Sequence, residues 1–599
     1  MCGIVGYIGT KKACPILLAG LSRLEYRGYD SAGISTIEKD GLSLMKDKGR
    51  VKNLSNLNGI DKLEGTIGIA HTRWATHGKP SKENSHPHQD NSKTFSVVHN
   101  GIIENYLELR DELIKMGYNF ISETDTEVAC ALIDSLYKDN ILEAITQAIT
   151  KMRGSFALGI LVDGDDNLYA TRLTSPLIIG VCDNENYIAS DVPAILKYTN
   201  KYILLDDYDI AKITDSNITI YNDLKEVNRE TLTFSGSMEM GMKNGYEHFM
   251  LKEIHEQDKV IKNTIGYYFD GTIDSIITNL PDLTKYNKID IVACGSAYHT
   301  GLVGKSLIEK FADTEVNCEV ASEYRYKKSF YDNKTLVILV SQSGETADTL
   351  AALRKAKDDG IDTLAIVNVV GSSIAREAKY VLYIKAGCEI AVATTKAYTA
   401  QLAIFSLIAI NLAYTKKLLN KDELNEIIKE INNLPNIINK TLKNTDYIDI
   451  AKKIYKRDDI FFIGRGIDYA LSMEGSLKLK EISYINSMAY AAGELKHGTI
   501  SLIEDGTPVI AISTDKDLTE KTVSNIKEVK ARDAYTLFVT NNYIEGDFYD
   551  DIIVVDKIHE LLQPIITIIP LQLLSYEVAR LNGCDIDKPR NLAKSVTVE

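Results

Sequence analysis

The chain has 599 residues, of which 45% are hydrophobic and 25% are charged, and its formal net charge at pH 7 is −15. At about 150 residues per domain, this length predicts three or four domains of an ordinary globular protein. The acidic balance argues against a nucleic acid partner, because phosphate backbones are bound by basic surfaces.

The first 218 residues are rich in short β-type runs that are separated by Gly, Asn and Asp, a pattern that predicts a layered sheet domain. Two stretches, 105–115 and 126–137, have helical spacing. The apolar pattern weakens between 220 and 250, so we expect a linker over 219–279. The expected strands are 3–8, 32–37, 66–71, 95–99, 156–162, 168–172, 177–181 and 210–213.

Cys2 directly follows the initiator methionine. Once Met1 is removed, Cys2 carries a free α-amino group beside its own thiol. Such an amine titrates near ~7.7–8.0, so an appreciable fraction is unprotonated at neutral pH and acts as a base. A thiol becomes a strong nucleophile only as the thiolate. Cys2 is therefore a candidate nucleophile, and the alternative is an ordinary cysteine that follows the start codon.

From about residue 280, apolar strands alternate with amphipathic helices, which predicts an open parallel sheet of the α/β class. The stretch 290–298 aligns with 461–469 at a constant shift of 171 residues, and in each copy a strand ends in glycine before a helix begins. Two copies of one α/β unit are therefore expected at 280–420 and 450–589, with a helical stretch near 420–450 between them and a tail at 590–599.

Neither a membrane span nor a metal site is expected. The start lacks the regions of a signal peptide, and the apolar runs 402–413 and 561–574 are short or interrupted by proline. Eight cysteines without a CxxC pair fit reduced thiols in a cytoplasm. His86 and His88 have no ligand partner at suitable spacing, so we interpret them as part of a polar loop.

Four segments accompany Cys2, and together they resemble the class II glutamine amidotransferase family. The resemblance implies an N-terminal-nucleophile (Ntn) hydrolase domain over 2–218, in which Cys2 hydrolyses glutamine. The segments are YRGYDSAG at 26–33, HTRWATHG at 71–78, HNGIIEN at 99–105 and ETDTE at 123–127.

The residue types in these segments suit that reaction. The amide of Asn100 and the backbone N–H of Gly101 can stabilise an oxyanion, although Asn-Gly is also a common hairpin turn. Arg73 offers a forked cation for the α-carboxylate of glutamine and Asp125 a carboxylate for its α-ammonium, while a surface ion pair is the simpler alternative. By resemblance, Thr76 and His77 line the glutamine pocket. The resemblance also makes Trp74 a gate for ammonia, for which a packed core aromatic is the alternative.

The repeated unit resembles the sugar isomerase (SIS) domain, a doubly wound parallel-sheet fold. The two copies resemble the isomerase half of the glutamine–fructose-6-phosphate aminotransferase family, as does the closing segment PRNLAKSVTVE at 589–599. SQSGET at 341–346 follows a strand and opens a helix, where hydroxyl and N–H groups form a phosphate cradle, or a plain N-cap. The expected sugar-phosphate contacts are Ser296, Ser341, Gln342, Ser343, Thr346, Val392 and Thr394.

Two positions depart from the family pattern. The family commonly has serine where this chain has Thr394, and a hydroxyl where it has Ala297, which puts one sugar contact in doubt.

The resemblance implies transfer of ammonia to the ketose carbon, followed by proton movement from C1 to C2. In the family, the lysine at position 594 forms an imine with the open-chain ketose; a solvated tail is the alternative. Glu481 is the candidate proton shuttle, with Lys478 on the same helix face, although the two could form a surface ion pair. His497, in GELKHG at 493–498, is the candidate ring-opening acid and base.

The expected substrates are glutamine and fructose 6-phosphate, and the expected products are glucosamine 6-phosphate and glutamate. No cofactor is needed, pyridoxal phosphate included, because glutamine supplies ammonia that passes internally to the sugar. We expect a homodimer, since SIS domains usually pair. Two alternatives remain: another class II amidotransferase, which would need a diphosphate or ATP loop, and a sugar-phosphate-sensing SIS regulator, which would need a basic DNA-binding head.

Overall fold

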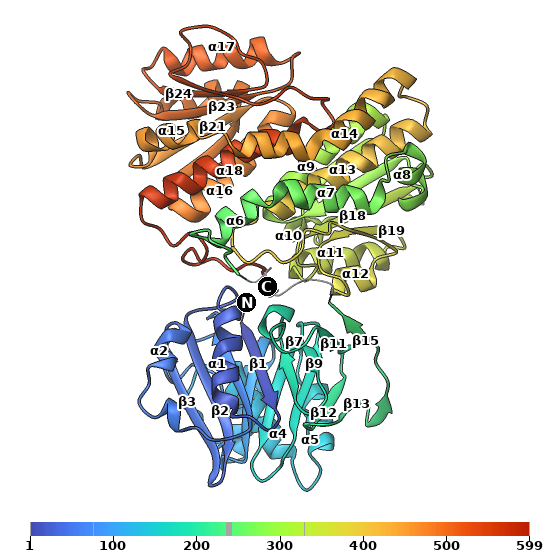
Figure 1. The fold of residues 1–599 in the computed structure, drawn as a ribbon. Helices are drawn as coiled ribbons and strands as arrows, with labels where there is room; N and C mark the ends of the chain where they lie inside the picture. The colour runs from blue at the N-terminus through green and yellow to red at the C-terminus, as the bar shows by residue number, and fades with distance from the viewer. Residues whose placement is uncertain (1, 76, 235–241, 329, 333, 598–599) are drawn as a thin grey trace. The chain divides into compact units, whose positions relative to one another are not determined.

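The computed structural model describes residues 2–75, 77–234, 242–328, 330–332 and 334–597 (Figure 1). It divides into two compact units, Met1–Gly241 with Ala593–Glu599, and Met242–Leu592. The segment 219–279, expected as a linker, carries regular structure on both sides of this division. Its elements are most of β13 (Ile218–Asn222), then β14 (Lys225–Val227), β15 (Thr231–Thr233), α6 (Phe249–His255), α7 (Gln257–Tyr268) and α8 (Ile273–Asn279).

The first unit contains two antiparallel sheets. One has eight strands in the order β15-β11-β9-β10-β1-β4-β2-β3, and the other has seven in the order β14-β13-β12-β8-β7-β6-β5. The remaining strands are β1 (Gly3–Ile8), β2 (Ser31–Glu38), β3 (Gly41–Lys48), β4 (Ile67–Arg73), β5 (His88–Gln89), β6 (Phe95–Ile103), β7 (Gly154–Val162), β8 (Leu168–Leu173), β9 (Ile178–Val181), β10 (Asn186–Ala189), β11 (Lys201–Leu204) and β12 (Ile210–Ile213).

The two sheets pack face to face through alternating apolar side chains such as Ile4 and Ile69 from one and Val98 and Ala157 from the other. Helix α1 (Ala13–Leu24) packs on the outer side of the first sheet. Helices α3 (Tyr106–Lys115), α4 (Asp125–Leu136) and α5 (Ile141–Lys151) cover the second through their own apolar cluster. The layered α+β domain predicted from the sequence is confirmed.

The second unit contains two parallel five-stranded sheets of the same topology, β17-β16-β18-β19-β20 and β22-β21-β23-β24-β25. The first strand of each copy, β16 (Lys288–Ala293) and β21 (Asp459–Gly464), is displaced by 171 residues, as predicted. The other strands are β17 (Glu315–Val320), β18 (Thr335–Ser341), β19 (Asp362–Val367), β20 (Tyr380–Tyr383), β22 (Asn486–Ala491), β23 (Pro508–Ser513), β24 (Tyr535–Thr540) and β25 (Asp551–Val554).

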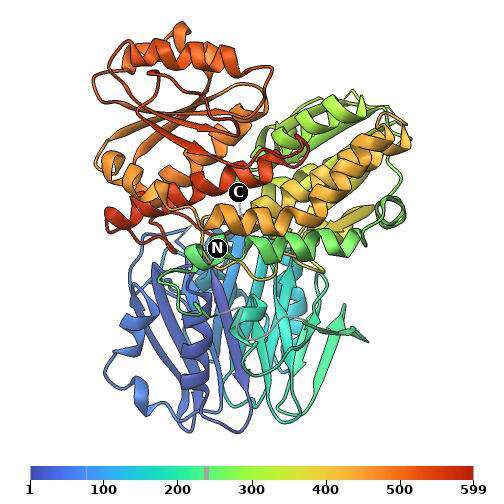
Figure 2. The ribbon, with the colours of Figure 1, turned by 45° about the horizontal axis from the view of Figure 1, so that its top comes forward.

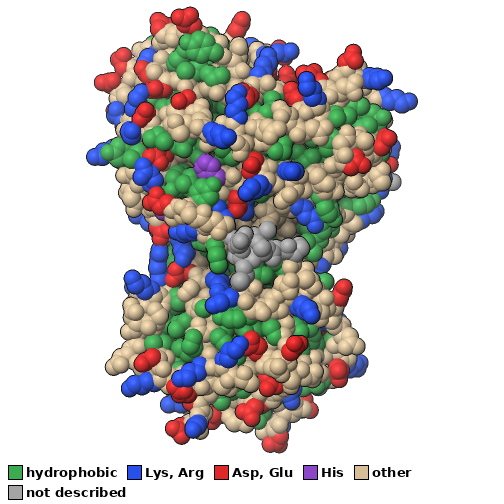
Figure 3. All heavy atoms as spheres, viewed as in Figure 1, with side chains coloured by type: hydrophobic (Ala, Val, Ile, Leu, Met, Phe, Trp, Pro, Cys, Tyr) green, Lys and Arg blue, Asp and Glu red, His purple; other side chains and the backbone are tan. Residues whose placement is uncertain are grey.

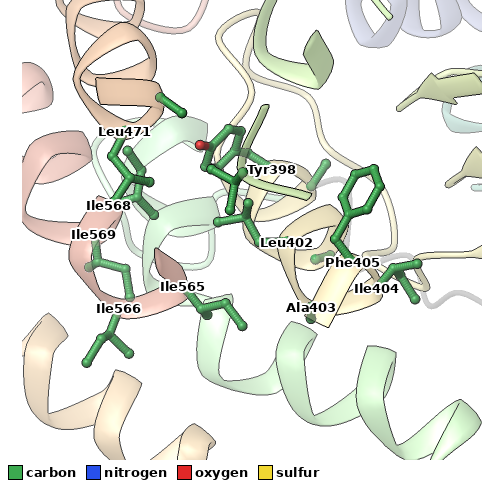
Figure 4. Close-up of a cluster of buried hydrophobic side chains, with 14 of the residues drawn as sticks. Tyr398, Leu402, Ala403, Ile404, Phe405, Leu471, Ile565, Ile566, Ile568 and Ile569 are labelled. Atoms are coloured by element: carbon green, nitrogen blue, oxygen red, sulfur yellow. The ribbon is translucent and has the colours of Figure 1, made fainter. Parts of the chain in front are cut away.

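One apolar core runs through both copies. Helix α13 (Lys396–Thr415) packs against α9 (Gly295–Ala312) and α7, while α16 (Ile467–Ser483) packs against α18 (Gln563–Leu581) (Figure 2). Figure 4 shows Phe405 and Leu402 of α13, Leu471 of α16 and Ile568 of α18 in this cluster. The outer faces carry α10 (Ala321–Tyr324), α11 (Ala347–Asp358) and α12 (Ser373–Glu377) in one copy and α17 (Thr519–Lys530) in the other; α14 (Lys421–Leu442) and α15 (Asp446–Ile454) join the copies.

The apolar runs at 402–413 and 561–574 are longer and more regular than the sequence suggested. They lie in α13 and α18, and Pro570 lies inside α18 without ending it. Both helices are long and apolar enough to cross a membrane, but 94% and 89% of their apolar windows are buried within the protein. Burial on all sides is typical of core helices.

Acidic and basic side chains are interspersed on the face shown in Figure 3, where no broad basic patch gathers. This agrees with the net charge of −15.

Candidate active sites

The thiol of Cys2 lies at the start of β1, beside the end of β4. Its sulfur accepts a hydrogen bond of 3.2 Å from the backbone N–H of Trp74. Its carbonyl oxygen accepts from Arg27 Nε and from Asn100 Nδ2, each at 3.1 Å. Burial raises the pKa of the Cys2 thiol, while the Trp74 N–H and the Arg73 charge oppose that rise. The nucleophile candidate is therefore held in place on three sides.

Arg73, the last residue of β4, is a buried cation with unused hydrogen-bonding capacity. Its side chain is 3% exposed, and Nη2 donates to the carbonyls of His77 and Gly78. Nη1 is buried and has no partner among the described residues. Burial lowers the pKa of Arg73, and the nearby Cys2 and Asp125 oppose this. A buried guanidinium edge without a partner is suited to bind a carboxylate.

Asp125 begins α4, where Thr124 is the N-cap. Its Oδ2 accepts from the backbone N–H of Ile103 at 2.9 Å, and His99 Nδ1 lies 3.7 Å from Oδ1. Burial alone would raise the pKa of Asp125, but His99 and the Ile103 N–H hold it below its ordinary value. The group is thus an ionised, buried carboxylate that can bind an ammonium.

Asn100 and Gly101 lie inside β6, paired with Ala157 and Phe156, so the hairpin-turn alternative is wrong. Gly101 has a φ of +130°, and a Cβ there would lie 2.0 Å from the carbonyl oxygen of Ser155. Only glycine fits this close approach of two strands.

The other predicted residues of this unit are less fully defined. Thr76 lies outside the described residues. The His77 ring packs edge-on against Tyr106 with centroids 5.1 Å apart. Trp74 is half-buried, and its ring lies edge-on to Tyr29 with centroids 5.9 Å apart.

In the second unit, the loop 341–346 joins the carboxyl end of β18 to α11, as predicted. The Ser341 hydroxyl accepts from the Gly344 N–H at 3.0 Å and lies 2.9 Å from the Thr346 hydroxyl, and the Ser343 hydroxyl accepts from the Glu345 N–H. Thr346 is the N-cap of α11. Because β17 and β18 flank β16, the loop lies where the strand order reverses, the usual ligand position in such sheets.

Ser296, near the start of α9, contacts a buried acid that the sequence did not single out. Its hydroxyl donates to Glu474 Oε1 at 2.9 Å, and His299 Nδ1 lies 2.8 Å from Oε2. Glu474 is fully buried on α16. The hydroxyl expected to contact sugar is thus bonded to the second copy of the repeat.

Lys478 and Glu481 form an ion pair on α16, with Nζ 2.5 Å from Oε2. The Lys478 ammonium is 1% exposed and lies 3.6 Å from Glu474. Burial alone would lower the pKa of Lys478, but the two carboxylates raise it above its ordinary value. The surface-pair alternative is therefore wrong, because the lysine is buried and charged.

Val392 and Thr394 lie in the segment before α13. The Val392 N–H donates to the Asp587 carbonyl at 3.0 Å. The Thr394 hydroxyl donates to Glu389 Oε2 at 2.5 Å, and Glu389 also accepts two backbone N–H groups at the start of α13.

Comparison with known proteins decides the family. The glutamine amidotransferase domain model matches residues 71–197, and the SIS domain model matches 282–411 and 453–581. The glutamine–fructose-6-phosphate aminotransferases (isomerizing) of Caldanaerobacter subterraneus and Clostridium tetani are 52% and 51% identical to this chain, each over 100% of both sequences.

The chain belongs to the glutamine–fructose-6-phosphate aminotransferase family.

A solved structure supports the assignment of the second unit. The C-terminal domain of the glucosamine–fructose-6-phosphate aminotransferase from Francisella tularensis is 38% identical, with a TM-score of 0.55, and covers 58% of this chain and 100% of its own.

Two further residues are expected in this aminotransferase family's sugar chemistry, His497 and Lys594. His497 ends a short 3₁₀ helix (Ala492–His497), and its side chain is exposed. Lys594 is half-buried and belongs to the first unit, with the part of the tail from Ala593 onward. Both assignments stay predictions.

In the second copy of the repeat, the side chain of Asp468 occupies the loop after β23, which is equivalent to the loop 341–346. Asp468, which aligns with Ala297, is 1% exposed and accepts from the Thr514 hydroxyl at 2.6 Å and from the backbone N–H groups of Thr514 and Asp515 at 2.8 and 3.3 Å. These donors follow β23, as Ser341 follows β18.

His86 lies in a loop, as expected, and His88 begins β5, but both side chains are buried rather than in a solvent-exposed polar segment. The His86 ring stacks on His71 with centroids 4.2 Å apart, and His88 pairs in β5 and bonds Thr124. Arg27, to which no role was assigned from the sequence, lies in the segment 26–33 and donates a hydrogen bond to the Cys2 carbonyl.

Proposed function

We propose that this chain converts fructose 6-phosphate and glutamine into glucosamine 6-phosphate and glutamate, the first step of hexosamine synthesis. Water hydrolyses the amide of glutamine, and the ammonia released condenses with the ketose and returns one water. The net reaction therefore needs no other reactant.

The observation that carries the proposal is the buried, unpartnered Nη1 of Arg73 beside Cys2. An orphaned buried guanidinium edge is costly unless an anion binds there. Asp125 supplies a buried carboxylate in the same unit. A cation and an anion near one thiol match the α-carboxylate and α-ammonium of an amino acid whose side chain reaches the sulfur.

In the proposed glutaminase step, the Cys2 thiolate attacks the carboxamide carbon and ammonia leaves after accepting a proton. The free α-amine of processed Cys2 serves as base. Asn100 and the Gly101 N–H stabilise the oxyanion, and water then releases glutamate from the thioester. Thr76 and His77 complete the glutamine pocket.

In the proposed sugar step, the loop of Ser341, Gln342, Ser343 and Thr346 binds the phosphate at the start of α11. Lys594 forms the imine with the ketose, His497 opens the ring, and Glu481 moves the proton from C1 to C2. Lys478 positions the Glu481 carboxyl group through their 2.5 Å contact. Ser296, Val392 and Thr394 complete the sugar contacts.

Ammonia passes internally in this proposal, because free ammonia in water is protonated and loses its nucleophilicity. Trp74 gates that passage.

We propose that the protein is a homodimer in the cytoplasm. Sedimentation of the purified chain measures the oligomeric state, and a monomer would contradict the proposed dimer.

The direct test is to supply amide-¹⁵N glutamine with fructose 6-phosphate. We expect ¹⁵N in glucosamine 6-phosphate, with little dilution by unlabelled ammonium in the buffer. Unlabelled or absent product would contradict the proposal.

Mass analysis of the active enzyme should show that Met1 is removed. Retained Met1 would contradict the proposal that the α-amine of Cys2 acts as the base.

Two variants separate the half-reactions. Cys2→Ala should abolish use of glutamine while leaving isomerisation of fructose 6-phosphate measurable, and the half-buried Cys182→Ala is its control. Lys594→Ala should abolish sugar chemistry and spare glutamine hydrolysis, with the half-buried Lys588→Ala as control. Retained amino-sugar formation in Lys594→Ala would contradict the imine role.

A further inference from the structure

His71 lies next to the predicted oxyanion hole but has no place in the chemistry above. It is fully buried in β4, two residues before Arg73. Its Nε2 lies 2.9 Å from the carbonyl oxygen of His99 and 3.1 Å from Oδ1 of Asn100. One ring nitrogen is therefore shared between a backbone carbonyl and the side chain of the oxyanion candidate.

The partners on both sides fix the direction of these bonds. A backbone carbonyl only accepts, so the contact with His99 requires a hydrogen on His71 Nε2. A donor at Nε2 then requires that the atom of Asn100 facing it is the oxygen. On the opposite side, Asn100 Nδ2 lies 3.1 Å from the carbonyl oxygen of Cys2, which also only accepts. The two carbonyls thus specify the same orientation of the Asn100 amide.

The His71 ring donates these hydrogen bonds as a neutral imidazole. Burial lowers the pKa of His71 to about 3, so the imidazole is neutral at neutral pH. A neutral ring with its hydrogen on Nε2 leaves Nδ1 as a bare lone pair, and Nδ1 has no partner among the described residues. The stacked His86 contacts the face of the ring and leaves its Nε2 edge to Asn100.

We propose that His71 is a positioning residue that holds the Asn100 amide with its nitrogen toward Cys2, so that the second N–H of that amide faces the developing oxyanion. An amide nitrogen carries two hydrogens, and the Cys2 carbonyl takes one. In the reversed orientation the Asn100 oxygen would face the oxyanion and repel it. The inference rests on the proposed glutaminase reaction.

The test compares glutamine hydrolysis by full-length His71→Leu, His71→Gln and His86→Leu. Losing one oxyanion donor lowers kcat by about 10²–10³-fold. We expect a loss of that size in His71→Leu with KM changed less than about threefold, because Arg73 and Asp125 are intact. Glutamine places an N–H where Nε2 stood, so His71→Gln should recover most of the activity. His86→Leu removes a buried ring from the same stack and should keep kcat within about threefold.

A second measurement separates orientation of the amide from packing. Glutamate γ-semialdehyde adds the Cys2 thiol to its aldehyde carbon and places the resulting oxygen in the oxyanion hole, whereas glutamate does not. Affinity for the aldehyde should fall in His71→Leu in parallel with kcat/KM, and affinity for glutamate should not change. Equal losses for both compounds, or equal impairment of His71→Leu and His71→Gln, would overturn the inference.

If His71→Leu does not fold, a measurement on the wild-type protein still tests the inference. ¹⁵N-histidine spectra of the wild-type protein report which ring nitrogen carries the hydrogen, and a His71 protonated on Nδ1 would overturn the inference. Cys2→Ala separates the two proposals. If it still hydrolyses glutamine, the proposed function and this inference both fail. If it does not, an unchanged kcat in His71→Leu overturns only the role of His71.

Discussion

The hydroxyl of Ser296 donates a 2.9 Å hydrogen bond to the carboxylate of Glu474, and the two residues come from different copies of the repeated unit. Glu474 also lies 2.8 Å from His299 and 3.6 Å from the ammonium of Lys478. One buried acid therefore connects a predicted sugar contact with a predicted catalytic pair.

Glu474→Gln should lower isomerisation of fructose 6-phosphate by about tenfold or more, equivalent to about 1.4 kcal/mol, because Lys478 loses a buried counter-charge. Glutamine hydrolysis, assayed without sugar, should not change. Glu474→Ala should also reduce the stability of the second unit by about 3–5 kcal/mol. The exposed Lys480→Gln on the same helix is the control, and an isomerisation rate in Glu474→Gln that matches it would contradict this prediction.

Arg73→Lys should raise KM for glutamine by about tenfold or more while kcat changes less, because an ammonium cannot reproduce a forked contact with a carboxylate. Steady-state glutaminase kinetics provide the measurement. Arg153→Lys, at an exposed pair with Glu108, should leave both parameters unchanged. A kcat loss at constant KM would show that Arg73 does not bind glutamine in the ground state.

Gly101→Ala should abolish glutamine hydrolysis and reduce the stability of the first unit by about 2–3 kcal/mol, since its Cβ would lie 2.0 Å from the Ser155 oxygen. The matched control is Gly117→Ala, where φ is +99° but no atom lies within 4 Å, and this should cost about 1 kcal/mol. Denaturant unfolding followed by the fluorescence of Trp74, the single tryptophan, reports on the first unit. Equal costs in the two variants would contradict the steric argument.

The unfolding free energy of the first unit should fall as the pH falls from about 6.5 to about 4.5. Burial lowers the pKa of His71 to about 3 and those of His86 and His88 well below their ordinary value. In that range the unfolded chain binds protons that the folded chain excludes, so each histidine contributes up to about 1.4 kcal/mol per pH unit.

His88→Gln provides the control for that pH dependence. It should reduce the slope by about one proton, measured by Trp74 fluorescence in denaturant at a series of pH values. A slope equal to that of the wild type would show that His88 does not contribute.

The sequence predicted local elements well and long-range contacts poorly. The strand 3–8 is confirmed within β1, and the shift of 171 residues relates β16 to β21, because alternation and repetition are local patterns. The hydrogen bond from Ser296 to Glu474 could not be predicted, because it joins residues that are 178 positions apart in the sequence. The same holds for Asn100 and Gly101, whose Asn-Gly pair is typical of a turn yet lies in a strand held by β7.

The aspartate at position 468 makes the two halves of the duplication unequal. An anion that approached the loop after β23 would find the donors it needs already bonded to the carboxyl group of Asp468. The first copy has only the methyl group of Ala297 at the matching position. If the loop after β18 is the phosphate site, as we propose, we therefore expect each chain to bind one phosphorylated sugar rather than two.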